Sequence, residues 1–145
     1  MKAIQNPMDA KEVLGFIRAW VRLLSTGDFL QAQNWLYEIP ESSGERRPVL
    51  SREAIGMYSP DFAAASKKNK DAVMPTVNDP AEMPQHGEVF EHWKFDATDK
   101  NGNEAWGAEY YLPLNGEWSH MCASFEILKS PCGQYGVRLI DLNVP

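Results

Sequence analysis

The dipeptide Asn115-Gly116 lies between two segments in which apolar and polar residues alternate. It is typical of a two-residue type I′ turn, which joins antiparallel strands and determines which residues face one another. The turn predicts that Leu114 pairs with Glu117. Counting outward from that pair gives three inward-facing pairs: Trp106 with Phe125, Ala108 with Ala123, and Tyr110 with Met121.

The alternation extends over the C-terminal part of the chain and predicts an antiparallel meander. Four strands are expected near residues 88–97, 104–114, 118–129 and 134–144, with a second turn signal at 99–102. In the last strand, Val137 and Leu139 lie on one face while Ile140 and Leu142 alternate with them. That pattern is typical of a β-bulge, or of a strand covered on both faces.

The N-terminal part has the three- and four-residue spacing of amphipathic helices. Asp9 followed by Glu12 resembles a capping box, and the apolar stripe that follows is Val13, Ile17, Trp20, Val21 and Leu24. After Gly27 and Asp28, a second stripe predicts a helix from Phe29 to Ile39, ended by Pro40. Ser51 begins a short third helix that ends at Tyr58-Ser59-Pro60.

These patterns predict a single α+β domain over residues 1–145, because 145 residues is an ordinary size for one domain. The helical part covers about 8–60, an irregular segment with several prolines about 61–86, and the antiparallel sheet about 87–145. We expect a helical hairpin and a short third helix packed on a meander of four or more strands.

A helical hairpin followed by an aromatic-rich meander resembles the NTF2-like and cystatin-like α+β roll, in which a curved sheet wraps a helix. The run from Glu117 to Glu126 and the ending from Leu139 to Val144 also look like small uncharacterised bacterial domains of this architecture. NTF2-like members include small-molecule enzymes, ligand-binding modules and immunity proteins that neutralise toxins. The resemblance carries no catalytic residue to this chain. Where enzymatic members hold a polar pair, the predicted inward face has Trp93, Phe95, Trp106, Tyr110, Met121 and Phe125.

Charge and hydropathy narrow the functional classes. The net charge of −6 and the pI near 5.0 oppose nucleic-acid binding and are compatible with a basic protein partner. Residues 1–7 lack the apolar core of a signal peptide, and no stretch approaches the ~18 apolar residues of a membrane span. We therefore expect a cytoplasmic bacterial-type protein without a membrane partner and, with only Cys122 and Cys132, without a disulfide framework.

Three polar residues on neighbouring strands could converge. In the predicted register His92, Glu109 and His120 share the outer sheet face, where imidazole and carboxylate groups could hold zinc. The alternative is a set of polar residues on a solvent-facing sheet, and this alternative is favoured. A nucleophile formed by Cys122 is not expected, because His120, two residues away in the strand, lies nearly 7 Å from it at ~3.3 Å per residue. No metal, cofactor or catalytic group is therefore predicted.

The leading hypothesis is a non-enzymatic interaction protein, of which an immunity-type inhibitor of a basic partner is one form. The predicted partner-binding residues lie on the outer sheet face, where polar and aromatic side chains suit a protein contact. They are Tyr111, His120, Trp118, Glu109 and His92.

Two other functions remain open. A small-molecule-binding protein or enzyme would place its pocket between helices and sheet, lined by Trp20, Trp93, Trp106 and Tyr110. Homodimerisation through the outer sheet face would bury the same aromatic residues symmetrically.

Overall fold

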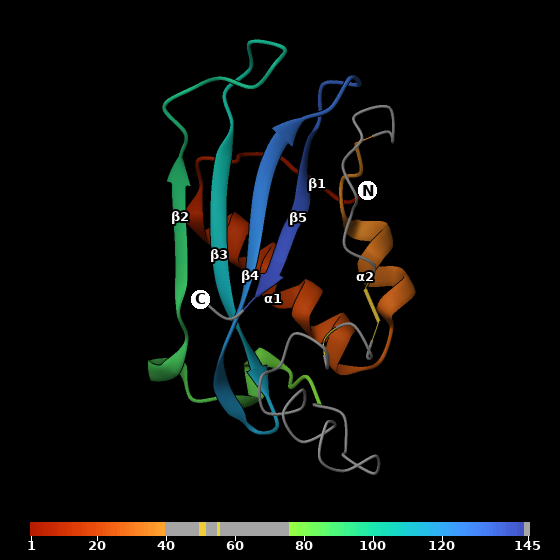
Figure 1. Ribbon diagram of the computed structural model, residues 1–145, viewed down its shortest axis with the longest axis vertical. Coiled ribbons are helices and arrows are strands. Elements are labelled where there is room, and N and C mark those ends of the chain that lie inside the picture. The colour runs from red at the N-terminus through yellow and green to blue at the C-terminus, as the bar shows by residue number, and fades with distance from the viewer. Residues whose placement is uncertain (40–49, 52–54, 56–75, 144–145) are drawn as a thin grey trace.

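The computed structural model of the chain describes residues 1–39, 50–51, 55 and 76–143 (Figure 1). Within that part the protein is an α+β structure with two α-helices and a curled antiparallel sheet of five strands in the order β1-β5-β4-β3-β2. The elements are β1 (Ala3–Ile4), α1 (Ala10–Ser25), α2 (Phe29–Trp35), β2 (Phe90–Lys94), β3 (Trp106–Leu114), β4 (Glu117–Lys129) and β5 (Tyr135–Asn143). No helix in this part is both long and apolar enough to cross a membrane.

The predicted first helix is confirmed. The Asp9 side chain caps α1 by accepting a hydrogen bond of 2.9 Å from the backbone N–H of Lys11, and the Glu12 carboxylate reaches back to the N–H groups of Gln5 and Asn6. The apolar stripe of α1 is buried against the sheet. Helix α1 crosses behind the sheet in Figure 1, so we call the sheet surface that it covers the inner face and the opposite surface the outer face.

The second helix is shorter than predicted. Helix α2 ends at Trp35, and Leu36 has an extended backbone. The next residue, Tyr37, contacts the sheet instead, because its N–H donates a 2.7 Å hydrogen bond to the carbonyl of Val137 in β5. The predicted third helix lies outside the described residues, apart from Ser51 and Ile55.

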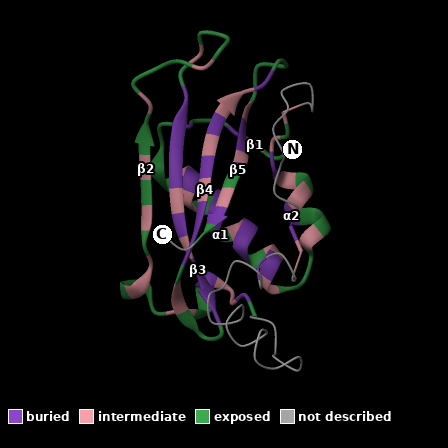
Figure 2. Ribbon diagram, viewed as in Figure 1, coloured by how far each residue is buried: buried purple, intermediate pink, exposed green. Residues whose placement is uncertain are grey.

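All four predicted strands are present, with the two-residue β1 added beside β5. The Asn115-Gly116 turn is confirmed, since both residues have positive φ (54° and 81°) and Leu114 pairs with Glu117. Figure 2 shows that buried positions concentrate on β3, β4 and β5, whereas the edge strand β2 is half-buried or exposed.

Beyond the turn the predicted register is wrong by two residues. Trp106 pairs with Ile127, Ala108 with Phe125 and Tyr110 with Ala123. A bulge in β4 causes the shift, since three residues between Trp118 and Cys122 oppose the single residue Leu112. Its Ser119 hydroxyl donates to the carbonyl of Leu112 at 2.6 Å and accepts from the N–H of Met121 at 3.1 Å. A shift of two preserves the face of every residue, so the predicted inward residues of β3 and β4 are buried.

A second bulge explains the last strand. Ser124 pairs with Asp141 but Phe125 pairs with Leu139, so Ile140 is an extra residue in β5, and it is exposed. The strand therefore buries Val137, Leu139 and Leu142 on one face, and of the two interpretations of its pattern the bulge is confirmed.

Candidate binding face on the sheet

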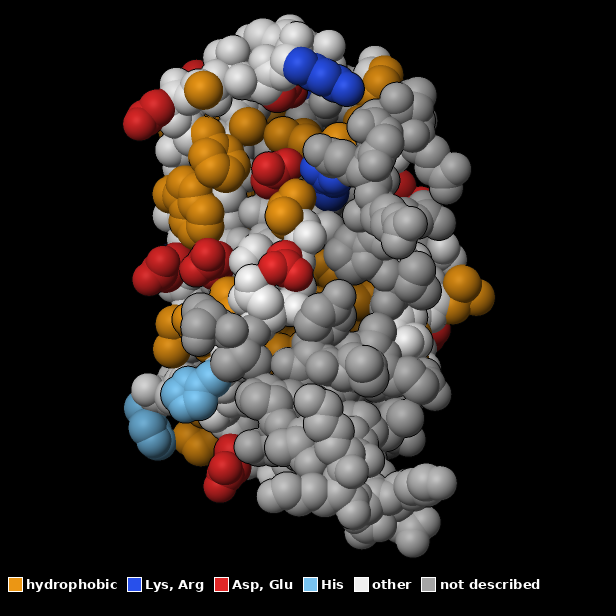
Figure 3. Space-filling view, in the orientation of Figure 1, with side chains coloured by type: hydrophobic (Ala, Val, Ile, Leu, Met, Phe, Trp, Pro, Cys, Tyr) orange, Lys and Arg blue, Asp and Glu red, His pale blue; other side chains and the backbone are white. Residues whose placement is uncertain are grey.

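The outer face consists of cross-strand rows that the register specifies. One row runs from Glu91 through Glu109 and Ser124 to Asp141, and the next from Trp93 through Gly107 and Glu126 to Arg138. Figure 3 shows this side of the molecule, with hydrophobic side chains along its left side, where β2 lies in Figure 1, and acidic side chains beside them. The two rows thus place carboxylates and an aromatic ring side by side.

The inward-facing and outward-facing residues of strand β2 are the reverse of the prediction. Trp93 pairs with Gly107 and lies on the outer face, where it is 36% exposed, whereas His92 pairs with the buried Ala108 on the inner face. The His92 ring Nε2 lies 2.8 Å from the carbonyl oxygen of Pro7. The residue pattern did not settle this orientation, because β2 has aromatic side chains on both faces.

Gly107 explains how the indole of Trp93 is accommodated on the outer face. A Cβ atom at Gly107 would lie 2.4 Å from the Trp93 ring, so only glycine lets the indole lie this close to β3. The Phe95 ring meets the indole edge-on, with ring centroids 6.0 Å apart. The glycine inside β3 is the sequence signal that could have placed Trp93 on this face.

Two carboxylates of the outer face lie directly opposite each other. Glu91 and Glu109 form a cross-strand pair, and in the described part of the chain neither side-chain carboxylate has a hydrogen bond or an ion pair. Like charges in this position repel. Burial raises the pKa of the Tyr111 hydroxyl, and Cys122 and the two carboxylates add to that rise. Burial likewise raises the pKa of the Cys122 thiol, with a further contribution from Glu109 and Glu91. The row therefore carries a local negative potential.

The five predicted partner-binding residues are distributed over different surfaces. Glu109 and Tyr111 share the outer face, and Tyr111 pairs with Cys122 rather than with His120. His120 is exposed in the β4 bulge, and His92 lies on the inner face. The His92, Glu109 and His120 trio therefore does not converge, and the described residues contain no metal-binding cluster of His, Cys, Asp or Glu.

Trp118 is held against the segment that precedes β2 rather than beside Tyr111. Its Nε1–H donates to the carbonyl of Pro84 at 2.7 Å, and a Cβ atom at Gly87 would collide with its ring. Its ring centroid lies 6.1 Å from that of Tyr110. The indole therefore closes one end of the core.

The residues predicted to line a pocket between helices and sheet fill the core instead. Trp20 and Tyr110 are completely buried, Trp106 is 3% exposed, and Trp93 is on the opposite face. The Trp20 indole donates to the carbonyl of Ala32 at 3.0 Å. These four side chains therefore do not surround one space.

A half-buried carboxylate links α1, the segment before β2, and β3. Glu88 accepts hydrogen bonds from the Arg18 Nε at 2.9 Å, from the Arg18 Nη2, and from the Tyr110 hydroxyl at 2.8 Å. Burial alone would raise the pKa of Glu88, but these hydrogen bonds and the Arg18 charge outweigh burial and lower the pKa. Burial and the bond to Glu88 raise the pKa of Tyr110. Glu88 therefore has a structural role, because it connects α1 to the sheet.

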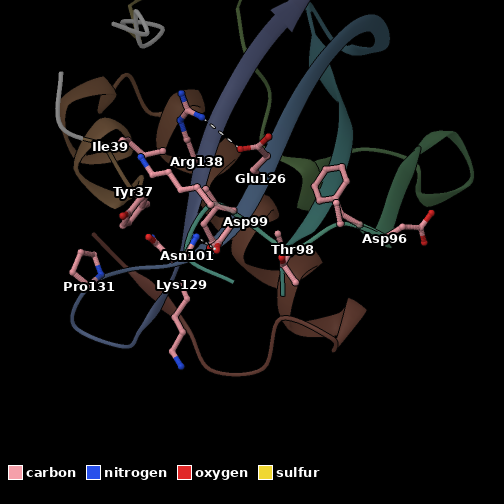
Figure 4. A pocket seen from close by; sticks show the side chains of 15 residues that line it. Tyr37, Ile39, Asp96, Thr98, Asp99, Asn101, Glu126, Lys129, Pro131 and Arg138 are labelled. Carbon is pink, nitrogen blue, oxygen red and sulfur yellow. Dashed lines mark hydrogen bonds and ion pairs between the residues drawn. The ribbon is translucent and has the colours of Figure 1, made fainter. Parts of the chain in front are cut away.

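A pocket of about 530 Å³ opens at one end of the outer face (Figure 4). Its lining comes from the β2–β3 loop, the β4–β5 turn, residues 37–39 and the ends of β4 and β5, and includes Phe95 and Leu128. Figure 4 shows Arg138 and Glu126 facing each other across neighbouring strands, with Nη1 and Oε2 3.5 Å apart. The sequence did not predict this pocket, because its lining comes from separate segments.

Comparison of the chain with protein-family models, with curated proteins and with solved structures gives no match. The fold and the outer face together define an α+β protein whose sheet presents an acidic and aromatic surface away from its α1-covered core.

Proposed function

We propose that the protein is a non-enzymatic binding module whose outer sheet face binds a basic partner protein. The observation that carries this proposal is the directly opposed pair Glu91 and Glu109, with the exposed ring of Trp93 in the next row. This arrangement is unfavourable in the free protein and becomes favourable when a cation binds, because the cation offsets the repulsion.

The neighbouring indole supports recognition of a lysine or arginine side chain. A cation over a tryptophan ring gains about 0.5–2 kcal/mol, and the two carboxylates lie one row away on the same face. Trp93 is held between Gly107 and Phe95 before binding, so less conformational freedom is lost on association. The net charge of −6 also favours rapid encounter with a basic protein.

An immunity-type inhibitor, in which the bound partner is a basic toxin, is one form of this function. In that form, substitutions that weaken binding at Glu91 and Glu109 also release the activity of the toxin.

A defined basic peptide tests the proposal. Fluorescence anisotropy is measured for a labelled octapeptide of alternating lysine and valine, with the E91Q/E109Q variant and with E82Q/E117Q. Both variants change the net charge by the same amount, but Glu82 and Glu117 are exposed and away from the outer-face rows. We expect E91Q/E109Q to weaken binding by about tenfold or more, whereas E82Q/E117Q has little effect. Equal affinities for the two variants would contradict the proposal, because binding would then follow net charge alone.

A small-molecule-binding function is the second candidate, and the observation that favours it is the pocket of about 530 Å³. Volumes of roughly 300–1,000 Å³ are typical of small-molecule sites. Native mass spectrometry of gently purified protein should then detect an adduct that is lost in Leu128→Trp, which fills the pocket, and retained in E82Q/E117Q. A protein without an adduct, whose thermal unfolding no added small molecule shifts, would end this candidate.

The finer fold assignment that we propose is the NTF2-like or cystatin-like roll. Its support is the helix α1 packed on one face of a curled antiparallel meander, as that roll requires.

A further inference from the structure

One edge of strand β2 pairs with no strand among the described residues. It is the last strand of the sheet, and in Figure 1 it runs along the left side of the sheet with no described strand beyond it. Its five-residue ladder to β3 has no register shift and contains no proline. Bulges and prolines are common devices that block pairing at an edge, so β2 keeps a regular edge that can accept another strand.

The hydrogen bonds to β3 show which backbone groups of β2 face outward. The carbonyl of Val89 accepts from Tyr111 at 3.3 Å, and the N–H of Phe95 donates to Ala105 at 2.9 Å. Backbone groups alternate in direction along an antiparallel strand, so the odd-numbered residues of β2 bond to β3. The N–H and C=O groups of Phe90, His92 and Lys94 therefore point away from the sheet.

We propose that this edge binds an extended, basic segment of the partner protein, which adds to the sheet as a sixth strand beside β2. The inference rests on the proposed function and specifies the geometry of the bound partner. The backbone of the incoming segment bonds to Phe90, His92 and Lys94. Its side chains opposite Glu91 and Trp93 lie on the outer face, because neighbouring strands share the alternation of faces.

The charges of the outer face select the sequence of the incoming segment. Residues opposite Glu91 and Trp93 are two apart in the added strand, with Cβ atoms about 4.5–5.5 Å from their partners. Lysine or arginine at these two positions meets the Glu91 and Glu109 carboxylates and the Trp93 ring. A basic residue at every second position is thus the expected recognition pattern.

A second copy of the chain fits this edge poorly. A copy paired through its own β2 would bring another Glu91 and Glu109 to the same sheet, because Glu91 belongs to the edge strand β2 and Glu109 to its neighbour β3. Four carboxylates would then share one region, which like-charge repulsion disfavours. Charge complementarity therefore favours a basic partner over self-association.

Residue-resolved amide hydrogen exchange tests the geometry. The alternating lysine and valine octapeptide is added to the full chain, and exchange is followed by NMR. We expect the amides of Phe90, His92 and Lys94 to gain protection on binding, whereas Glu91 and Trp93, already bonded to β3, change less. Protection of these three amides that rises with concentration of the protein alone would show self-pairing and overturn the inference.

Modified peptides provide a test that leaves the protein unchanged. N-methylation of alternate peptide amides removes the donors along one edge and keeps every charge. We expect methylation on the edge that faces β2 to weaken binding by about tenfold or more, and methylation on the other edge to have little effect. If E91Q/E109Q weakens binding while neither methylated peptide differs from the parent, strand addition is wrong and the proposed outer-face function stands. If E91Q/E109Q and E82Q/E117Q bind the peptide equally, the proposed outer-face function itself is wrong.

Discussion

At the scale of single residues, the outer face depends on Gly107. The absence of a side chain there leaves the space that the Trp93 indole occupies, and the indole in turn covers the backbone of β3. The exposed aromatic surface therefore depends on a glycine in the neighbouring strand. The same substitution at two glycines separates this packing effect from the general effect of replacing glycine.

We expect Gly107→Ala to lower the free energy of unfolding by about 1–3 kcal/mol, because the new Cβ meets the Trp93 ring. It should also shift the Trp93 indole N–H resonance in NMR spectra. Gly15→Ala is the control, since Gly15 is exposed in α1 with nothing within 4 Å of an added Cβ. That change should raise the free energy of unfolding by about 0.5–1 kcal/mol. Urea denaturation measures both, and similar stabilisation by the two changes would refute the packing account.

At the scale of elements, Glu88 ties α1 to the sheet through Arg18 and Tyr110. The segment before β2 is therefore anchored from two sides, and Arg22 adds a further contact to Asp79 at 3.4 Å. This link positions the N-terminal end of β2, from which Glu91 and Trp93 project to the other face. The anchoring carboxylate is on one side of the sheet and the binding residues are on the other.

The Glu88 link predicts a pH dependence of stability. Because the folded state lowers the pKa of Glu88, its contribution is present above the pKa of unfolded Glu, about 4.3, and is lost as pH falls through the lower folded value. The difference in unfolding free energy between wild type and Glu88→Gln, measured by urea denaturation, should thus be largest near neutral pH and shrink in acid. Glu104→Gln, which removes the exposed partner of Lys94, should change stability by about 1 kcal/mol or less. A Glu88→Gln difference that persists unchanged into acid would contradict this role.

At the scale of the whole molecule, part of the excess negative charge lies near one edge of the sheet. The opposed carboxylates Glu91 and Glu109 lie on the edge strand β2 and on its neighbour β3, close to the edge of β2 that no described strand covers. A surface that costs stability in the free protein and becomes favourable with a partner is expected at a binding site rather than in a structural role.

This cost can be measured in the free protein. We expect E91Q/E109Q to increase the free energy of unfolding by about 0.2–1 kcal/mol at low ionic strength, because it removes the cross-strand repulsion. The gain should decrease in 1 M salt, where charges are screened within about 3 Å. Thermal and urea denaturation at two salt concentrations provide the measurement, with E82Q/E117Q as the charge-matched control. A destabilised E91Q/E109Q variant would show that the two carboxylates have stabilising partners.

The sequence by itself determined where α1 begins, where the four strands of the meander lie and which face of β3 and β4 is buried. These features depend on local causes, namely the Asp9 cap, the period of two and the positive φ angles at Asn115 and Gly116. A register error of two residues did not change which residues point inward, because side chains along a strand point to the same face every two residues.

Only the tertiary structure decided the features on which the candidate site depends. The facing of β2 follows from its pairing with β3 across the long 95–105 connection, which has no two-residue turn to specify register. Trp93 and Gly107 are far apart along the chain, and so are the segments that line the pocket beside Arg138. Contacts of this kind depend on packing between segments distant in sequence, whereas alternation along one strand reports only which residues share a face.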